Sequence, residues 1–461
     1  MALLDSRNLL DGIPDYREYM NVDELNSSSE KLAREHPSTV KMLDLGKSSK
    51  GEPIRCLKMG EGKHNALIYG FPNPEEPVGG LVIDYLSRSL AENKSLLREI
   101  DYTWYFIKCI DPDGARLNVG FLKGPLTPMN FSKNYYRTSD SLSGEENFPY
   151  RYGDIDFNRP LPETKALMKI LDETSFDFIS GLHNMKWGGV TYQVSEPCSH
   201  LYGPFQEMAK GYDVMPRKMP GTMLAPGIQL AQYFTPVRNY VRAKTAGKSP
   251  LEEITGAYTF EYAQLSNPHV FMMIPECALW YDVRCWDDRP SDSPFTDVLT
   301  YRSQVGTEAN KFMLSIFQRA EPLLKHPSPF FEMIRPLIRE IRSPTVNVSD
   351  PDPDLSKQRI DRPATIAEKV EIEGRADVYR LFNLGAMIRL LDDQLAQSAT
   401  GKSTLESCRA ETVSKLEAWG KELDRKYECR HHPIRNLVGV CLGSIIHSME
   451  YVKWNTWVRT H

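Results

Sequence analysis

Three short apolar runs, each followed by a polar residue or a polar loop, constrain the fold of this chain most. Residues 66–69 lead into a loop that contains Glu76, residues 176–182 end at His183, and residues 270–275 end at Glu276. Runs of this length between turn residues are typical of buried strands. Helical segments separate them, which indicates a layered α/β domain. Such domains bind ligands at the carboxyl ends of their strands, so we expect Glu76, His183 and Glu276 to meet.

The pattern changes after about residue 300. Before it, the sequence also predicts strands at 38–46, 52–58 and 102–110 and helices at 22–36, 78–92 and 163–173. After it, helical spacing recurs over 305–342, 364–396, 403–427 and 433–455, interrupted by a proline- and aspartate-rich break at 343–356. We therefore predict an α/β domain over residues 1–320 and an all-helical extension over residues 321–461.

Composition excludes several classes of protein. With 41% hydrophobic and 25% charged residues the chain is globular rather than disordered, and its net charge of -5 gives no basic surface for nucleic acid. The N-terminus lacks a basic segment followed by an apolar core, and no apolar run has the length of a membrane helix. The eight cysteines occur singly, without a CxxC pair. We expect a cytoplasmic protein with reduced thiols and with no nucleic-acid or membrane partner.

The loop after the first apolar run holds a candidate metal ligand. Glu76 follows a buried strand closely, where a carboxylate is well placed to bind a metal ion, whereas Asn73 offers only a neutral amide oxygen. The alternative is a surface turn in which Glu76 begins a helix. His183 is a second candidate ligand, and its alternative is a structural role at the end of a strand.

Glu276 is the candidate general base. Burial at the end of an apolar strand favours the protonated form of a carboxyl group, which suits a group that accepts a proton during a reaction. The alternative is a structural ion pair with a nearby arginine such as Arg284. Glu261, in the preceding segment, is a rival for the same role.

Two arginines are candidates for substrate recognition. Arg159 follows Asn158 in a loop, and an arginine beside an amide side chain suits bidentate binding of a carboxylate. Arg116 could bind a carboxylate in the same way or polarise a carbonyl group. For each arginine the alternative is an ordinary surface position.

Taken together, these segments resemble the M14 family of zinc carboxypeptidases. The resemblance covers roughly residues 20–320, and its motifs follow the family's order: 32–37, 45–54, 70–79, 111–114, 156–159, 162–167 and 182–184. It implies a three-layer domain around a mixed sheet. It also implies a zinc ion at Asn73, Glu76 and His183, where Asn73 stands at the position of the family's first histidine.

The resemblance implies a hydrolase that cleaves a peptide or amide bond of an amino-acid-like substrate bearing a carboxylate. Glu276 would act as the base and Arg116 would stabilise the oxyanion, while Asn158 and Arg159 would bind the substrate carboxylate. The alternatives are a metal-depleted pseudoenzyme or binding protein with the same pocket, and condensation or cyclisation chemistry on the same scaffold.

The loss of the first histidine raises the question of what completes the metal site. The candidates are a weakly binding Asn73, a shift of Glu75, and a ligand from Cys429, His431 or His432 in the helical extension; His64 stands at the wrong end of its strand. Tyr192 or Tyr240 could assist in the pocket. The apolar stripe of the extension predicts that it caps the pocket or forms an interface between copies of the chain.

Overall fold

The structure is a computed structural model. It describes residues 2–138, 143–153, 155–218, 223–231, 256–342, 362–397 and 400–460. The break predicted at 343–356 and the candidate Tyr240 lie outside these ranges. None of the helices described is both long enough and apolar enough to cross a membrane.

A mixed sheet forms the centre of the α/β part. Among the described residues its strands follow the order β1-β2-β4-β3-β7-β11-β8-β10-β9, with β14 paired to β11. β4, β3, β7 and β11 are parallel neighbours, and antiparallel pairs extend the sheet on both sides. The strands are β1 (Val40–Lys47), β2 (Pro53–Met59), β3 (His64–Gly70), β4 (Tyr102–Ile107), β7 (Phe178–Trp187), β8 (Val190–Val194), β9 (Met223–Ala225), β10 (Ile228–Leu230), β11 (Phe271–Tyr281) and β14 (Arg430–His431).

Helices cover both faces of this sheet. Alternate side chains of the central strands enter two separate apolar cores, as strands buried on both faces require. One core includes α1 (Ala2–Asp11), α2 (Val22–Glu35), α3 (Val78–Glu92), α4 (Lys94–Ile100), α9 (Ser199–Gly211) and α17 (Ile434–Thr460). The other includes α8 (Pro162–Glu173) and α11 (Thr259–Ala263). The predicted three-layer α/β fold with a mixed sheet is confirmed.

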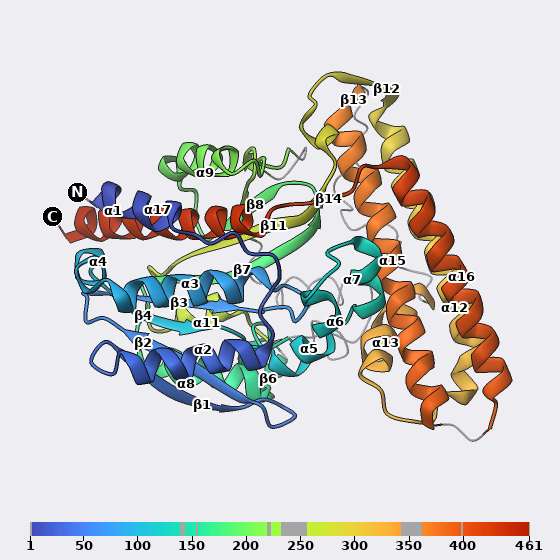
Figure 1. Ribbon diagram of the computed structural model, residues 1–461, viewed down its shortest axis with the longest axis horizontal. Helices are drawn as coiled ribbons and strands as arrows, with labels where there is room; N and C mark the ends of the chain where they lie inside the picture. The colour runs from blue at the N-terminus through green and yellow to red at the C-terminus, as the bar shows by residue number, and fades with distance from the viewer. Residues whose placement is uncertain are drawn as a thin grey trace.

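The C-terminal part contains the predicted helices. α12 (Phe295–Ala320), α13 (Pro329–Arg342), α15 (Ile366–Gln397) and α16 (Lys402–Lys426) form an upright bundle beside the α/β layers (Figure 1). α17 leaves the bundle and packs on α3, α9 and β11, beside α1. The division predicted at residue 320 does not separate the two packing regions. α12, which precedes it, packs in the bundle, and α17, which follows it, packs on the sheet. The division itself stays a prediction.

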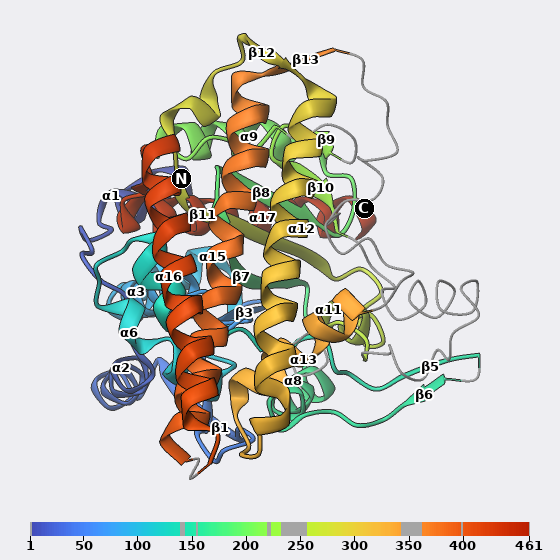
Figure 2. The same cartoon turned by 90° about the vertical axis from the view of Figure 1, so that its right-hand side faces the viewer.

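Short elements connect these layers. Between the sheet and the bundle lie α5 (Pro112–Leu117), α6 (Val119–Leu122) and α7 (Pro128–Asn134), and α7 packs directly on α15. Two small hairpins pair β5 (Tyr150–Tyr152) with β6 (Ile155–Phe157) and β12 (Pro290–Pro294) with β13 (Pro363–Thr365). The described residues also include two 3-10 turns, η3 (Val283–Trp286) and η4 (Glu321–Leu323). Viewed from the bundle side, α12, α15 and α16 stand in front of the sheet (Figure 2).

Candidate functional site

The candidate site begins in the loop between β3 and α3. Phe71 is fully buried, yet its φ of 52° lies in the left-handed region that side chains other than glycine rarely adopt. Gly79 allows the start of α3 to approach β7, because a Cβ there would lie 2.7 Å from Cβ of Leu182. The loop is therefore held in a fixed path against the strand that carries His183.

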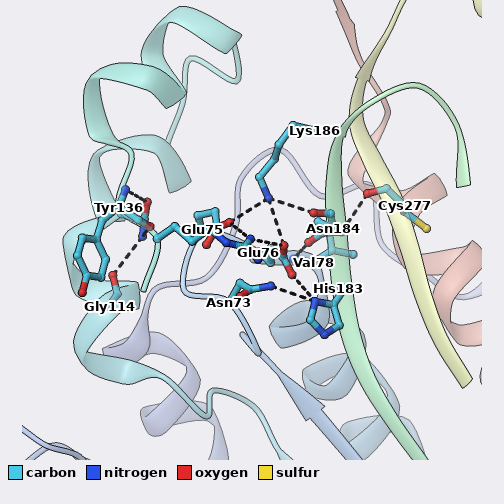
Figure 3. A network of polar contacts seen from close by, with 12 residues as sticks. Asn73, Glu75, Glu76, Val78, Gly114, Tyr136, His183, Asn184, Lys186 and Cys277 are labelled. Carbon is cyan, nitrogen blue, oxygen red and sulfur yellow. Dashed lines mark hydrogen bonds and ion pairs between the residues drawn. The ribbon is translucent and has the colours of Figure 1, made fainter. Parts of the chain in front are cut away.

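Glu76, His183 and Asn73 converge at one corner. Nδ1 of His183 lies 2.9 Å from Oε2 of Glu76 and 3.1 Å from Nδ2 of Asn73 (Figure 3). Oε2 of Glu76 is buried but has no hydrogen-bond partner, so its close contact with the imidazole is not aligned as a hydrogen bond. Oε2 of Glu76 and the Asn73 amide thus both lie close to Nδ1 of His183.

The carboxylate of Glu145, from a loop distant in the sequence, contacts the second ring nitrogen of His183. Oε1 of Glu145 lies 3.0 Å from Nε2 of His183, and Oε2 of Glu145 accepts a hydrogen bond of 3.0 Å from the Tyr69 hydroxyl. A carboxylate on one ring nitrogen fixes the tautomer and leaves the other nitrogen to face a ligand, as in many metal sites. Glu145 follows no apolar run and belongs to none of the sequence motifs, so nothing in the sequence singled it out.

Two cations lie on the other side of Glu76. Nζ of Lys186 is 3.4 Å from Glu76 and 3.5 Å from Glu75, and Nη1 of Arg137 is 2.7 Å from Glu75 and 3.5 Å from Glu76. Lys186, Glu75 and Glu76 are all nearly inaccessible to solvent. Neither cation was identified from the sequence, although Lys186 follows His183 by only three residues on the same strand.

These charges control protonation in the corner. Burial by itself would raise the pKa of Glu76, but Lys186, His183 and Arg137 outweigh it and hold that pKa well below its usual value. Burial by itself would lower the pKa of His183, but Glu145 and Glu76 outweigh it and raise that pKa well above 6.5. With only protein groups present, the corner therefore holds an anionic glutamate and a cationic histidine.

The donor atoms suit a zinc ion only if Asn73 takes part. Donors that share one zinc ion lie roughly 3.3 Å apart, which is close to the separations in this corner. Among the described residues no three His, Cys, Asp or Glu side chains group together as a metal site. The third donor has to be the amide oxygen of Asn73, which exchanges places with Nδ2 by a simple turn of the side chain. The residues thus fit zinc as a weak site.

Glu276 lies beside this corner. It stands directly opposite His183 in the parallel register of β7 and β11, and its carboxylate accepts a hydrogen bond from Gln193. The alternative pairing with Arg284 does not form, because Arg284 bonds to Asp282 instead. The rival Glu261 caps the start of α11, where its carboxylate accepts from the backbone N–H of Tyr258 at 2.9 Å. The register thus brings Glu276, the candidate base, next to the candidate metal corner.

The three other predicted site residues lie apart from this network. Arg116 binds Asp23 at 2.7 Å and Glu52 at 2.8 Å. Asn158 and Arg159 are exposed after β6, and Arg159 lies over the Phe157 ring at 5.6 Å. Among the described residues, no ion pair or hydrogen bond joins any of the three to Glu76, His183 or Glu276.

The remaining candidates occupy structural positions. His64 lies 3.6 Å from Asp177 at the far end of β3. His432 bonds to the Gly188 carbonyl oxygen at 3.3 Å and stacks on Tyr281, while His431 contacts Tyr19. The fully buried Tyr192 donates to the Phe205 carbonyl oxygen at 3.3 Å. None of these side chains contacts the corner at Glu76.

Comparison with known proteins gives a consistent assignment. Residues 25–223 match the sequence model of the zinc carboxypeptidase family, peptidase M14. A stretch of 107 residues is 26% identical to zinc carboxypeptidase A 1 of Anopheles gambiae, and 102 residues are 31% identical to a zinc carboxypeptidase of Simulium vittatum. These stretches cover 22% and 21% of this chain and 24% and 34% of the relatives. The chain thus matches only a quarter to a third of each relative's length.

Solved structures give a more distant similarity. The crystal structure of carboxypeptidase A from Helicoverpa armigera is 14% identical, with 59% of this chain and 71% of that chain covered and a TM-score of 0.35. A metallo-carboxypeptidase from Burkholderia cenocepacia is 13% identical, with 55% and 68% covered and a TM-score of 0.33. Values this low carry no argument about substrate or activity.

Proposed function

We propose that this chain hydrolyses a peptide or amide bond of an amino-acid-like substrate that bears a carboxylate, because residues 25–223 match the sequence model of the zinc carboxypeptidase family. Glu76, His183 and the amide oxygen of Asn73 would hold a zinc ion. The ion, when bound, would lower the pKa of a water molecule and polarise the scissile carbonyl group.

One observation carries this proposal. The buried Oε2 of Glu76 lies 2.9 Å from Nδ1 of His183, while Glu145 supports the opposite ring nitrogen and Glu276 stands beside them in register. A metal ion held by these two atoms would replace the proton that the imidazole carries between them. A ligand at this corner would lie between a supported imidazole and a carboxylate base.

The protein side of the reaction follows from these positions. Glu276 would take a proton from the attacking water and pass it to the leaving nitrogen. Gln193 holds the Glu276 carboxylate through its hydrogen bond, and Glu145 keeps Nδ1 of His183 facing the corner. Asn158 and Arg159 are the candidates that the family resemblance assigns to the substrate carboxylate, and Arg116 is its candidate for the oxyanion.

The test is to measure zinc binding and hydrolysis together. Wild type, Asn73→His, Asn73→Ala and His183→Ala are dialysed against zinc, and metal content is compared with hydrolysis of N-benzoylglycyl dipeptides that end in Phe, Arg or Glu. We expect measurable zinc in wild type, more in Asn73→His, and none in His183→Ala. Asn8→His, at an exposed position of α1, controls for the added imidazole. Wild type that binds no zinc and cleaves no dipeptide would refute the proposal.

A second function has its own support. Lys186 and Arg137 already neutralise Glu75 and Glu76, so the pocket is electrostatically stable without a metal ion. A binding protein with this pocket would retain a carboxylate-bearing ligand without cleaving it. Saturable binding of an uncleaved dipeptide by the zinc-free protein, together with no turnover in zinc, would favour this function.

A further inference from the structure

Helix α15 of the helical region lies directly on the strand that carries His183. The indole N–H of Trp187, the last residue of β7, donates to the Val370 carbonyl oxygen at 3.1 Å. Gly374 allows this contact, because a Cβ there would lie 2.5 Å from Cε2 of the Trp187 indole. The first turns of α15 therefore form a wall next to the candidate site.

A buried ion pair fixes this wall in place. Glu371 of α15 pairs with Arg217, and both side chains are less than a tenth exposed. The Glu371 side chain also lies beside Gly188, just after β7. One ion pair and one indole hydrogen bond thus tie the first turns of α15 to Arg217 and β7, so the residue one turn further along the helix has a defined position.

That residue is Arg375. It is half-buried, and within the described ranges no ion pair is formed by its guanidinium, which lies 5.3 Å from the centre of the Tyr379 ring. Burial would lower the pKa of Arg375, but Tyr379, Glu371 and Glu276 outweigh it and raise that pKa. Arg375 is therefore within electrostatic range of Glu276 and stays charged. The basic groups Lys186 and Arg137, by contrast, are engaged by Glu75 and Glu76.

Aromatic rings connect Arg375 to the other side of the site. Tyr379 packs on Phe382 at 5.3 Å, and Phe382 packs on Tyr135 at 5.1 Å. Tyr135 is close enough to Glu75, Arg137 and Glu76 for their charges to affect the pKa of its hydroxyl. The face of α15 that carries Arg375 and Tyr379 thus packs, through Phe382, against Tyr135, two residues before the Arg137 that pairs with Glu75.

We propose that Arg375, supported by Tyr379, binds a carboxylate of the ligand, so that the helical region supplies part of the binding site. A half-buried guanidinium that pairs with no carboxylate among the described residues presents two parallel N–H groups, the geometry that suits a carboxylate. This inference deepens the proposed function, since it assumes that the same pocket takes a carboxylate-bearing ligand. It does not depend on zinc or on turnover.

Four probes distinguish whether the recognised carboxylate is the terminal one or the side-chain one of the ligand. N-acetylglutamate carries two carboxylates, N-acetylglutamine only the terminal one, the α-amide of N-acetylglutamate only the side-chain one, and N-acetylglutamine amide none. Binding is measured by calorimetry for wild type, Arg375→Gln, Arg375→Lys and Tyr379→Phe, both with zinc and with a chelator. Arg409→Gln, which breaks an ion pair in the bundle, is the matched control.

Arg375→Gln should weaken the probes that carry the recognised carboxylate by about tenfold to a hundredfold and leave the neutral probe unchanged. Arg375→Lys should keep part of the affinity, and Arg409→Gln all of it. Whichever single-carboxylate probe is weakened identifies the source. Three results would each overturn the inference. In the first, Arg375→Gln weakens charged and neutral probes equally; in the second, it weakens none of the probes. In the third, wild type binds no charged probe more tightly than the neutral one. If Arg375→Gln has the expected effects but wild type neither binds zinc nor cleaves a dipeptide, only the proposed hydrolase activity is refuted.

Discussion

His183 and Glu276 stand directly opposite each other on the parallel strands β7 and β11. The register between the two strands, rather than any sequence motif, places the candidate base beside the candidate ligand. Side chains that oppose each other on neighbouring strands are separated by the fixed spacing of the sheet. A change at one of these two positions should therefore act on the site without moving its frame.

Glu276→Gln tests the base. If the chain is a hydrolase, this variant should lose about a hundredfold to ten-thousandfold in kcat while its affinity for a dipeptide stays the same, because only proton transfer is removed. Kinetics on the most rapidly cleaved dipeptide provide the measurement. Glu261→Gln is the control: its amide oxygen can still accept from the Tyr258 N–H, so it should lower the free energy of unfolding by under about 1 kcal/mol and leave kcat unchanged. A large loss of kcat in Glu261→Gln, with kcat unchanged in Glu276→Gln, would make Glu261 the base.

Lys186→Met tests whether a protein cation competes with the metal. Removing one partner of a buried ion pair costs about 3–5 kcal/mol of unfolding free energy, so the zinc-free variant should be markedly less stable than wild type. Added zinc should raise its melting temperature more than that of wild type, because the metal no longer meets the ammonium group. Lys186→Arg, which keeps the charge, should show a small zinc effect. A zinc effect equal in all three proteins would contradict this prediction.

The ion pair between Glu371 and Arg217 should stabilise the docking of α15. Glu371→Gln leaves Arg217 buried without its carboxylate, and we expect a loss of about 3–5 kcal/mol in unfolding free energy, measured by urea denaturation. Glu411→Gln is the matched control, since it breaks an exposed pair with Arg319 in the bundle and should cost under about 1 kcal/mol. Similar losses in the two variants would show that the buried pair does not hold the helix.

Asp111 should make stability depend on pH. Burial, the largest effect, raises its pKa from 3.8 to about 6 against the lowering by the hydrogen bonds from Thr138 and the Gly114 N–H, and Glu163 and Asp113 add smaller raising contributions. Between those two values the folded protein binds more protons than the unfolded chain, so the free energy of unfolding falls as pH rises from 3.8 to about 6, by roughly 3 kcal/mol. Above about pH 6 this contribution is constant.

Asp111→Asn should remove this pH dependence. The amide still accepts from the Gly114 N–H at the start of α5 but carries no charge at any pH. Urea denaturation at pH 4 and pH 7.5 should show a smaller difference for the variant than for wild type. Equal differences for the two proteins would mean that Asp111 ionises as freely in the folded state as in the unfolded chain.

The sequence by itself determined the layered fold and where its central strands begin, whereas β7 and β11 continue past His183 and Glu276 to Trp187 and Tyr281. Apolar periodicity is a local property of about ten residues, so it identified β3, β7 and β11 and the helices of the C-terminal region. The polar residue after each apolar run could then be assigned to one edge of the sheet. The positions of Glu76, His183 and Glu276 follow from this reasoning.

Only the tertiary structure decided what surrounds these residues. Glu145 and Arg137 reach the corner from segments that share no motif with it, Lys186 enters it from the strand that carries His183, and Arg217 meets Glu371 from a position 154 residues away. Arg116, Asn158 and Arg159, which the sequence suggested, are not joined to the corner at Glu76. The physical reason is that a buried charge takes the partner that packing brings within about 4 Å, and packing depends on the whole chain rather than on its local pattern.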